Sequence, residues 1–365
     1  MTESAIGKNI PALTGLRWIA AFLVLLRHNP PQRDSILYPA FSNGHSVVTL
    51  FFVLSGFVLT INYFDKFPRL TFEGIKDFYV ARIARIYPLY LVVLIGYGVV
   101  FRFDELTIVA QHVFLVQAWS SNSDVSYAMN GPGWSLGVEA FFYLVFPLAI
   151  YFSRPMLLQK GRAEALLVLC LTGIFMAALA FELADLGGLP ENDPNSMWRW
   201  LYRNPVARLG DFFAGIALAA IYIKQGGCRA VRMIRVSGYI SWFSLILALS
   251  CRGLIDNSFG VDFVFAVISC GLIFTSAVDR RSAISRFLSC GPLRVLGELS
   301  FAVYLVHVPI RQAIAVDFFG PGFTFGTVWK FLAYLVVVVG ISAILHYSVE
   351  RPARSVVRRA FGTRT

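Results

Sequence analysis

Apolar runs long enough to cross a lipid bilayer recur along this chain of 365 residues. A helix needs about 20 predominantly apolar residues to cross a hydrocarbon core ~30 Å thick. Ten runs approach or meet that length, at approximately 10–29, 46–64, 86–103, 134–152, 165–185, 206–223, 237–252, 259–278, 297–316 and 327–347. Charged residues make up 15% of the chain, whereas a soluble domain has about 25%. We therefore predict an all-α fold, a polytopic membrane bundle of about ten transmembrane helices.

An eleventh apolar run, 105–119, is shorter and is interrupted by Gln and His. The distribution of Lys and Arg indicates how it lies, because these residues concentrate in cytoplasmic loops. With ten spans and a cytoplasmic N-terminus, twenty-two of the 32 Lys and Arg fall in cytoplasmic segments and five in outer segments. An eleventh span would reverse every later loop and remove this asymmetry. We predict that 105–119 is re-entrant or interfacial, and that both termini face the cytoplasm of a plasma (bacterial inner) membrane.

The pattern of charge and cysteine disfavours other classes of protein. The net charge of +11 comes from short Lys and Arg clusters between apolar runs, which is typical of membrane topology and not of a nucleic-acid-binding face. The five Cys lie mostly in or beside apolar segments and form no CxxC motif. The sequence therefore predicts neither a disulfide framework nor a metal site. The lipid bilayer is a predicted partner, and nucleic acid is not.

Arg17 and His28 lie within and at the end of the first apolar run, where charge is costly. Eleven residues of helix make about three turns, so both side chains share one face, roughly 16 Å apart along the axis. Two interpretations are open from spacing alone. The residues line an interior passage, or Arg17 snorkels inward while His28 caps the helix at the interface. Arg27, on a different face, has no assigned role.

A pair of arginines, Arg82 and Arg85, precedes the third run at the predicted cytoplasmic side. Their spacing of three residues makes them neighbours on a helix. Two adjacent guanidinium groups suit bidentate binding of phosphate, although such pairs also serve as ordinary membrane anchors. Glu350 falls at the same interface, where its carboxylate can pair with one of these arginines and orient it.

Glu139 is a carboxylate about six residues into the fourth run, or roughly 9 Å deep from the outer side. An intramembrane carboxylate indicates a functional site and needs a partner, for which His28 and Arg17 are the candidates. The alternative is a buried ion pair that only holds two helices together.

Further polar residues within the runs have weaker signals. Tyr304 and His307 are three residues apart near mid-membrane, where a lone His is often only a hydrogen-bonded core residue. Ser55 and Gly56, small residues in the second run, predict close helix packing. Two acids near the outer ends of runs have no assigned role, and they are Asp211 and Asp262.

Six segments, taken together and in order, resemble the acyltransferase-3 family of integral membrane O-acyltransferases. They are LTGLRWIAAFLVLLRH, FFVLSGFVL, RIARIYPLY, WSLGVEAFFYLVFP, LGELSFAVYLVH and VERP. The resemblance implies about ten spans and transfer of an acyl group, commonly acetyl, from cytoplasmic acyl-CoA to a hydroxyl of a glycan. It implies functional roles for His28 and Arg17, and contact of Arg82 and Arg85 with CoA. We expect a single transmembrane acyltransferase domain over 1–365, without the fused extracytoplasmic domain that some relatives carry.

The resulting hypothesis makes neutral His28 the general base on the acceptor hydroxyl, since the pKa of imidazole, about 6.5, lies near working pH. Glu139 orients His28 or stabilises its cation, and Arg17 stabilises the oxyanion or binds the donor. Trp134 and Ser135 are assigned to the acceptor, a glycan or lipid-linked sugar. The remaining candidates are assigned to the acetyl-CoA donor, namely Arg82, Arg85, Tyr304, His307 and Glu350. A ping-pong route through an acyl-His28 intermediate is an alternative mechanism.

A different class of protein remains as the alternative. Intramembrane His, Glu and Arg equally suit a proton relay in an exporter, or in a flippase of a glycan or lipid-linked intermediate. The lack of an evident inverted repeat argues against such a transporter. An acyltransferase-like scaffold without activity is a third reading of the same residues.

Overall fold

The computed structural model describes residues 10–30, 38, 41, 43–225, 231–250, 260–314 and 328–361. All the elements in these ranges are helical, and the longer ones are α1 (Pro11–Arg27), α3 (Val48–Tyr63), α4 (Phe72–Val100), α7 (Trp134–Leu157), α8 (Arg162–Leu183), α9 (Leu209–Gln225), α10 (Val231–Ser250), α11 (Gly260–Val278), α13 (Gly291–Ile314) and α14 (Val328–Leu345). The shorter ones are η1 (Asn43–Val47), α5 (Leu106–Val113), η2 (Gln117–Trp119), α6 (Ser123–Tyr127), η3 (Gly131–Gly133), η4 (Trp198–Arg203), α12 (Ala283–Leu288), η6 (His346–Glu350) and α15 (Arg351–Ala360).

The all-α membrane fold that the sequence predicts is confirmed in its coarse form. Each of the ten apolar runs overlaps one of the ten longer helices. Helix α4 begins at Phe72, well before its run at 86–103, so Arg82 and Arg85 lie within this helix and do not precede it. Six helical segments in the described residues are long and apolar enough to cross a membrane, and they are Phe72–Val100, Gly131–Leu157, Arg162–Leu183, Met233–Ser250, Gly291–Ile314 and Trp329–Ala360. Helices α1 and α9 have 17 residues and α3 has 16, so they are shorter than a full span. The count of ten spans stays a prediction.

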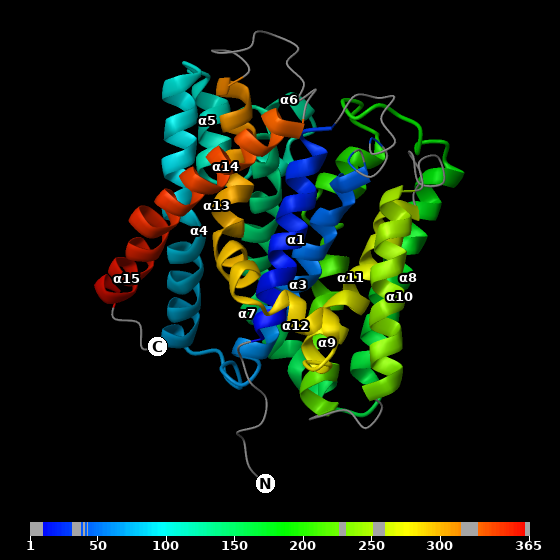
Figure 1. Cartoon of the computed structure of the whole chain (residues 1–365). Helices are drawn as coiled ribbons and strands as arrows, with labels where there is room; N and C mark the ends of the chain where they lie inside the picture. The colour runs from blue at the N-terminus through cyan, green and yellow to red at the C-terminus, as the bar shows by residue number, and fades with distance from the viewer. Residues whose placement is uncertain are drawn as a thin grey trace.

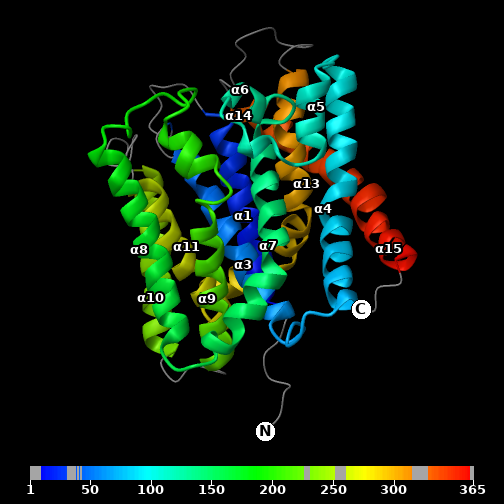
Figure 2. The same ribbon diagram turned by 180° about the vertical axis from the view of Figure 1, so that it is seen from behind.

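The long helices form one bundle in which successive helices run in alternating directions (Figure 1). Helices α8 and α10 lie at one edge and α15 lies at the opposite edge, as both views show (Figures 1 and 2). The outer surface of α8 is apolar, with Val168 63% and Leu169 67% exposed. Apolar side chains on the outside of a bundle are suited to lipid and not to water, as a membrane location requires.

The run at 105–119 folds back instead of crossing the bundle. It forms the eight-residue helix α5 and the short turn η2, and α5 lies beside the end of α4 in both views (Figures 1 and 2). Tyr90 on α4 donates a hydrogen bond to the carbonyl of His112, and Gln117 donates one to the carbonyl of Gly133. Together with α6, these elements form a cap over the start of α7, which we call the outer cap because the charge distribution in the sequence predicts that this end faces outward.

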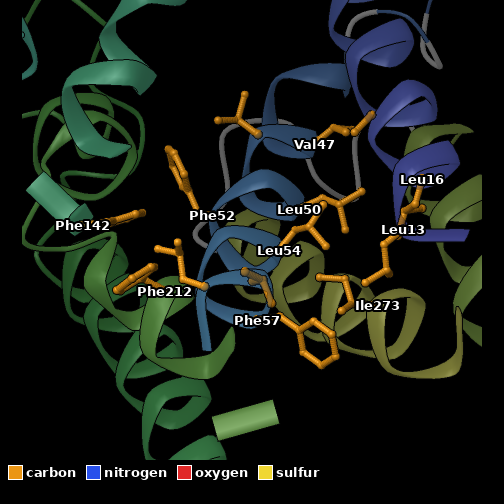
Figure 3. Packing of buried hydrophobic residues seen from close by; sticks show 14 of the residues in the cluster. Leu13, Leu16, Val47, Leu50, Phe52, Leu54, Phe57, Phe142, Phe212 and Ile273 are labelled. Atoms are coloured by element: carbon orange, nitrogen blue, oxygen red, sulfur yellow. The ribbon is translucent and has the colours of Figure 1, made fainter. Parts of the chain in front are cut away.

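Helix α3 lies in the middle of the bundle. Figure 3 shows it between the phenylalanines of α7 and α9 on one side and the leucines of α1 on the other. Phe142 and Phe212 stack with ring centroids 4.6 Å apart, and Phe52 of α3 meets Phe142 edge-on at 5.3 Å. Such aromatic contacts fix the orientation of α3, and with it the residues that α3 presents to the interior.

Two pairs of the longer helices touch backbone to backbone at glycines. In α3 and α9, a Cβ on Gly56 would lie 2.1 Å from the Phe212 carbonyl oxygen, and one on Gly215 would lie 2.1 Å from the Val53 oxygen. In α1 and α13, a Cβ on Gly297 would lie 2.1 Å from the carbonyl oxygen of Thr14. The prediction of close packing at Gly56 is confirmed, because only glycine permits this approach.

We expect Gly215→Ala to lower the free energy of unfolding by about 1–3 kcal/mol, because the new methyl group forces α3 and α9 apart. The thermal unfolding midpoint of the purified protein in detergent measures this. The matched control is Gly96→Ala in α4, where a Cβ would meet nothing within 4 Å. Equal midpoints for the two variants would show that the contact does not constrain the packing.

Candidate active site

Two cavities meet inside the bundle at the arginines that the sequence singled out. The inner cavity has a volume of about 130 Å³, and the basic chamber, near the start of α13, has about 660 Å³. Both are lined by Arg17, Arg82 and Arg85. The other polar residues of the inner cavity are Ser55, Ser135, Glu139, Tyr143, Ser300 and Tyr304. The three arginines therefore stand at the junction of a narrow space and a wide one.

Arg17 projects from the middle of α1 into this junction. Its side chain is half-buried and makes no hydrogen bond or ion pair within the described ranges. The structure therefore agrees with the interpretation in which Arg17 lines an interior passage, because its guanidinium lies in the wall of the cavities. Five N–H donors held away from lipid and without a partner can bind an anionic group of a ligand.

Arg82 is held by aromatic rings. Its guanidinium carbon lies 5.6 Å from the ring centroid of Tyr63, 5.9 Å from that of Phe78 and 5.8 Å from that of Tyr143. It donates one long hydrogen bond, 3.4 Å, to the Tyr63 hydroxyl, and its Nε has no partner in the structure. Cation–π contacts fix the position of the group while most of its N–H donors stay available for a ligand.

Arg85 is fixed by a buried carboxylate, as the sequence suggested. It donates to Glu350, which is 1% exposed and also accepts from Arg354. His346 places its Nδ1 2.7 Å from the second oxygen of the same carboxylate. Sequence reasoning missed Arg354 and His346, although each lies four residues from Glu350 on a continuous helix, the spacing at which side chains meet. One carboxylate thus connects α4 to η6 and α15.

We expect Glu350→Gln to lower the free energy of unfolding by about 3 kcal/mol, because it leaves two guanidinium groups around a buried site without their anion. The thermal unfolding midpoint of the purified protein reports this loss. The matched control is Asp65→Asn, which weakens a pair with Arg154 whose carboxylate side chain is 79% exposed. If both variants unfold at the temperature of the parent protein, Glu350 does not hold the end of the chain to α4.

Glu139 does not contact His28. It accepts hydrogen bonds from Ser55 at 3.3 Å and from Tyr143 at 2.5 Å, and it lines the inner cavity with Arg17. The depth predicted from the sequence assumed that α7 begins at the outer surface. The outer cap covers that end, so α7 starts inside the bundle and Glu139 lies deeper, at the level of the arginines.

Tyr304 and Ser135 form the other end of the inner cavity. Their hydroxyl oxygens are 2.7 Å apart, and the Tyr304 hydroxyl also donates to the Pro132 carbonyl at 3.2 Å. Trp134, assigned to the acceptor from sequence, is only 4% exposed, and its ring centroid lies 4.7 Å from that of Tyr202. The structure therefore brings Ser135 to the cavity and places the Trp134 indole in the core.

His28 and His307 are in contact, which the sequence did not predict. His307 Nε2 lies 3.1 Å from His28 Nδ1, and their ring centroids are 5.0 Å apart. The backbone of His307 is held in place by Tyr334 of α14, which donates to its carbonyl at 2.7 Å. The Tyr304 ring is 6.0 Å from the His307 ring, so Tyr304 and His307 connect the inner cavity to His28.

The hydrogen bonds of the two histidines assign their tautomers. His307 Nδ1 lies 3.1 Å from the Val303 carbonyl and must carry a proton there, so its Nε2 is an acceptor in the neutral ring. His28 Nδ1 lies 2.9 Å from the Val24 carbonyl oxygen and 3.1 Å from His307 Nε2. Both of these atoms are acceptors, so His28 Nδ1 also carries a proton. The Nε2 of neutral His28 then has a free lone pair, with no partner in the described part of the chain. This nitrogen can take up a proton.

A second charged cluster lies outside the two cavities. Arg208 donates to Asp211 at 3.1 Å and to Asp262 at 3.0 Å, and all three side chains are buried. The two acids without a role in the sequence analysis are thus the partners of one arginine. Such a buried triad links α9 to α11.

Comparisons with known proteins agree with this architecture. A family profile described as "Acyltransferase domain" matches residues 10–347. The chain is 29% identical to "Acyltransferase MdmB" of Streptomyces mycarofaciens, over 96% of this chain and 93% of that one. No solved structure is significantly similar to the chain.

Two other relatives are longer proteins. The chain is 26% identical to "O-acetyltransferase OatA" of Staphylococcus aureus, over 96% of this chain and 58% of that one. It is 23% identical to "Putative peptidoglycan O-acetyltransferase YrhL" of Bacillus subtilis, over 97% and 56%. It therefore spans a little over half the length of these two proteins. Because the profile covers nearly all of the sequence, the chain belongs to the acyltransferase-3 family.

Proposed function

We propose that this protein is an acyl-CoA-dependent O-acyltransferase of the bacterial inner membrane. In the simplest case it moves acetyl from cytoplasmic acetyl-CoA to a hydroxyl of an extracytoplasmic glycan or lipid-linked sugar. The observation that carries the proposal is the Nε2 of His28, which has no partner among the described residues. This nitrogen lies at one end of a polar path that begins at Arg82 and Arg85 and continues through Tyr304 and His307. The proposal includes ten spans with both termini cytoplasmic, which puts the arginines inside and His28 outside.

The donor occupies the cytoplasmic half in this proposal. Arg82 and Arg85 bind the diphosphate, since guanidinium groups are suited to phosphate oxygens. The thin pantetheine arm passes through the inner cavity and brings the thioester past Tyr304 towards His28. Arg17 supports the donor and not the oxyanion, because it is roughly 16 Å along the helix axis from His28.

The chemical step takes place at His28. Its Nε2 removes the proton of the acceptor hydroxyl while the oxygen attacks the thioester carbonyl carbon. The tetrahedral intermediate collapses with cleavage of the carbon–sulfur bond, and the imidazolium returns the proton to the departing CoA thiolate. His307 accepts the Nδ1–H of His28 throughout and keeps the reacting nitrogen in position. The products are an ester and free CoA.

The names of the relatives support an O-linked acyl product. OatA and YrhL are named as O-acetyltransferases, the second putatively of peptidoglycan, and MdmB as an acyltransferase. On that basis the acceptor class proposed here is the hydroxyl group of a sugar.

The experiment is acyl transfer in proteoliposomes that contain the purified protein, labelled acetyl-CoA and glycan extracted from the host envelope. We expect label in ester linkage on the glycan, released by mild alkali. Movement of glycan across the membrane without label would instead identify the exporter or flippase of the alternative hypothesis. If the glycan neither carries label nor crosses the membrane, both the acyltransferase and the transporter hypotheses are overturned.

A further inference from the structure

The basic chamber contains more positive charge than a diphosphate requires. Seven cationic side chains line it, and Glu298 is the one carboxylate among its lining residues in the described part of the chain. The cations are Arg17, Lys66, Arg82, Arg85, Arg351, Arg354 and Arg358. Its volume, about 660 Å³, lies within the usual range for pockets that enclose a small molecule. The chamber therefore suits a ligand with several anionic groups.

Three of these cations come from one face of the last helix. Arg351, Arg354 and Arg358 of α15 are three and four residues apart, so they project from α15 in the same direction. Arg359 lies on another face, where it donates to the Ser355 carbonyl and hydroxyl and does not line the chamber. Helix α15 contacts α4, the helix that carries Arg82 and Arg85, and lies at an oblique angle to it (Figures 1 and 2).

The donor has two separate anionic groups. Acyl-CoA carries a diphosphate between its pantetheine arm and its nucleotide, and a further phosphate on the 3′-hydroxyl of the ribose. With the arm in the narrow inner cavity and the diphosphate at the junction, the nucleotide remains in the wide chamber. The ribose phosphate then faces the wall formed by α15.

We propose that the arginine face of α15, formed by Arg351, Arg354 and Arg358, is the subsite for the 3′-phosphate of the donor. It makes the enzyme select CoA thioesters over thioesters that lack this phosphate. Arg354 is held in place by Glu350, while Arg351 and Arg358 lie on the exposed rim of the chamber. The inference rests on the proposed function, because it concerns the donor of that reaction.

The test compares binding of CoA and 3′-dephospho-CoA to the full chain in phosphatidylcholine nanodiscs, by isothermal titration. We expect the parent protein to bind CoA at least about tenfold more tightly, since charge-assisted hydrogen bonds to phosphate are strong. In Arg351→Gln/Arg358→Gln the preference falls to within about twofold, while the affinity for 3′-dephospho-CoA does not change. That unchanged affinity also shows that the variant is folded.

The matched control is Arg359→Gln, which removes the same charge from the other face of α15 and retains the tenfold preference. Equal binding of both nucleotides by the parent protein overturns the inference and leaves the acyl-CoA donor intact. A preference that survives in the double variant also overturns it. If the two substitutions instead weaken only the contact of α15 with bilayers that contain anionic lipid, then α15 binds the bilayer surface and the inference is overturned. Failure to bind either nucleotide contradicts the proposed donor itself.

Discussion

His28→Ala is expected to lower kcat for acyl transfer at least about 100-fold, because a positioned general base contributes a factor of this size or more. In the proposed mechanism the Nε2 of His28 removes the acceptor proton, and alanine leaves no base in its place. The affinity for CoA should not change, since the arginines of the junction are remote from the substitution. The measurement is transfer of labelled acetyl in proteoliposomes, with nucleotide binding as the check on folding.

The neighbouring His307 supplies the control for this experiment. His307→Gln keeps an acceptor oxygen beside His28 Nδ1, so it should retain much more activity than His28→Ala. Parent-level transfer by His28→Ala at normal expression would contradict the central assignment. An acyl-His28 intermediate requires label on the protein when acetyl-CoA is supplied alone, and label that persists in His28→Ala rules that route out.

Arg82→Ala/Arg85→Ala is expected to raise KM for acetyl-CoA by about 100-fold, with a much smaller change in kcat. Each guanidinium contributes charge-assisted hydrogen bonds worth about 1.5–3 kcal/mol, and a factor of ten corresponds to about 1.4 kcal/mol. In the proposed function the arginines bind the donor equally in the ground state and the transition state, so their loss should affect binding more than chemistry.

The same helix provides the control for the arginine pair. Lys76 is an exposed cation of α4 that lines neither cavity, so Lys76→Ala should leave KM at the parent value. If the arginine variant also keeps the parent KM, then Arg82 and Arg85 act only as anchors at the membrane surface.

The sequence predicts the helices well because hydrophobic length determines them almost alone. A helix of apolar residues satisfies its own backbone wherever it lies, so each of the ten runs overlaps one of the ten longer helices. The fold-back of 105–119 was also predictable, since its polar interruptions and the charge asymmetry both argue against a span. The exact start of α7 was not predictable, because it depends on how the outer cap packs over that end of the helix.

The charged residues of the site could be identified from sequence, but most of their partners could not. A charge within an apolar run indicates an interior position without showing which helix faces it. Glu350 was expected to pair with Arg82 or Arg85, and the structure pairs it with Arg85. Glu139 meets Ser55 and Tyr143 and not His28, because α7 starts inside the bundle and carries Glu139 deeper than the sequence indicates. His28 meets His307, a contact between helices that are distant in the sequence.

The glycine contacts have a consequence for motion. Helices whose backbones touch cannot slide or tilt separately, so α3 moves with α9, and α1 moves with α13. The inner cavity lies between these two rigid bodies, with α4 and α7 completing its wall. Any widening that admits a ligand therefore comes from displacement of one body against the other, or from α4 swinging outward together with α15. The ion pairs of Glu350 join α4 to α15, so these two helices move as one unit in that second motion.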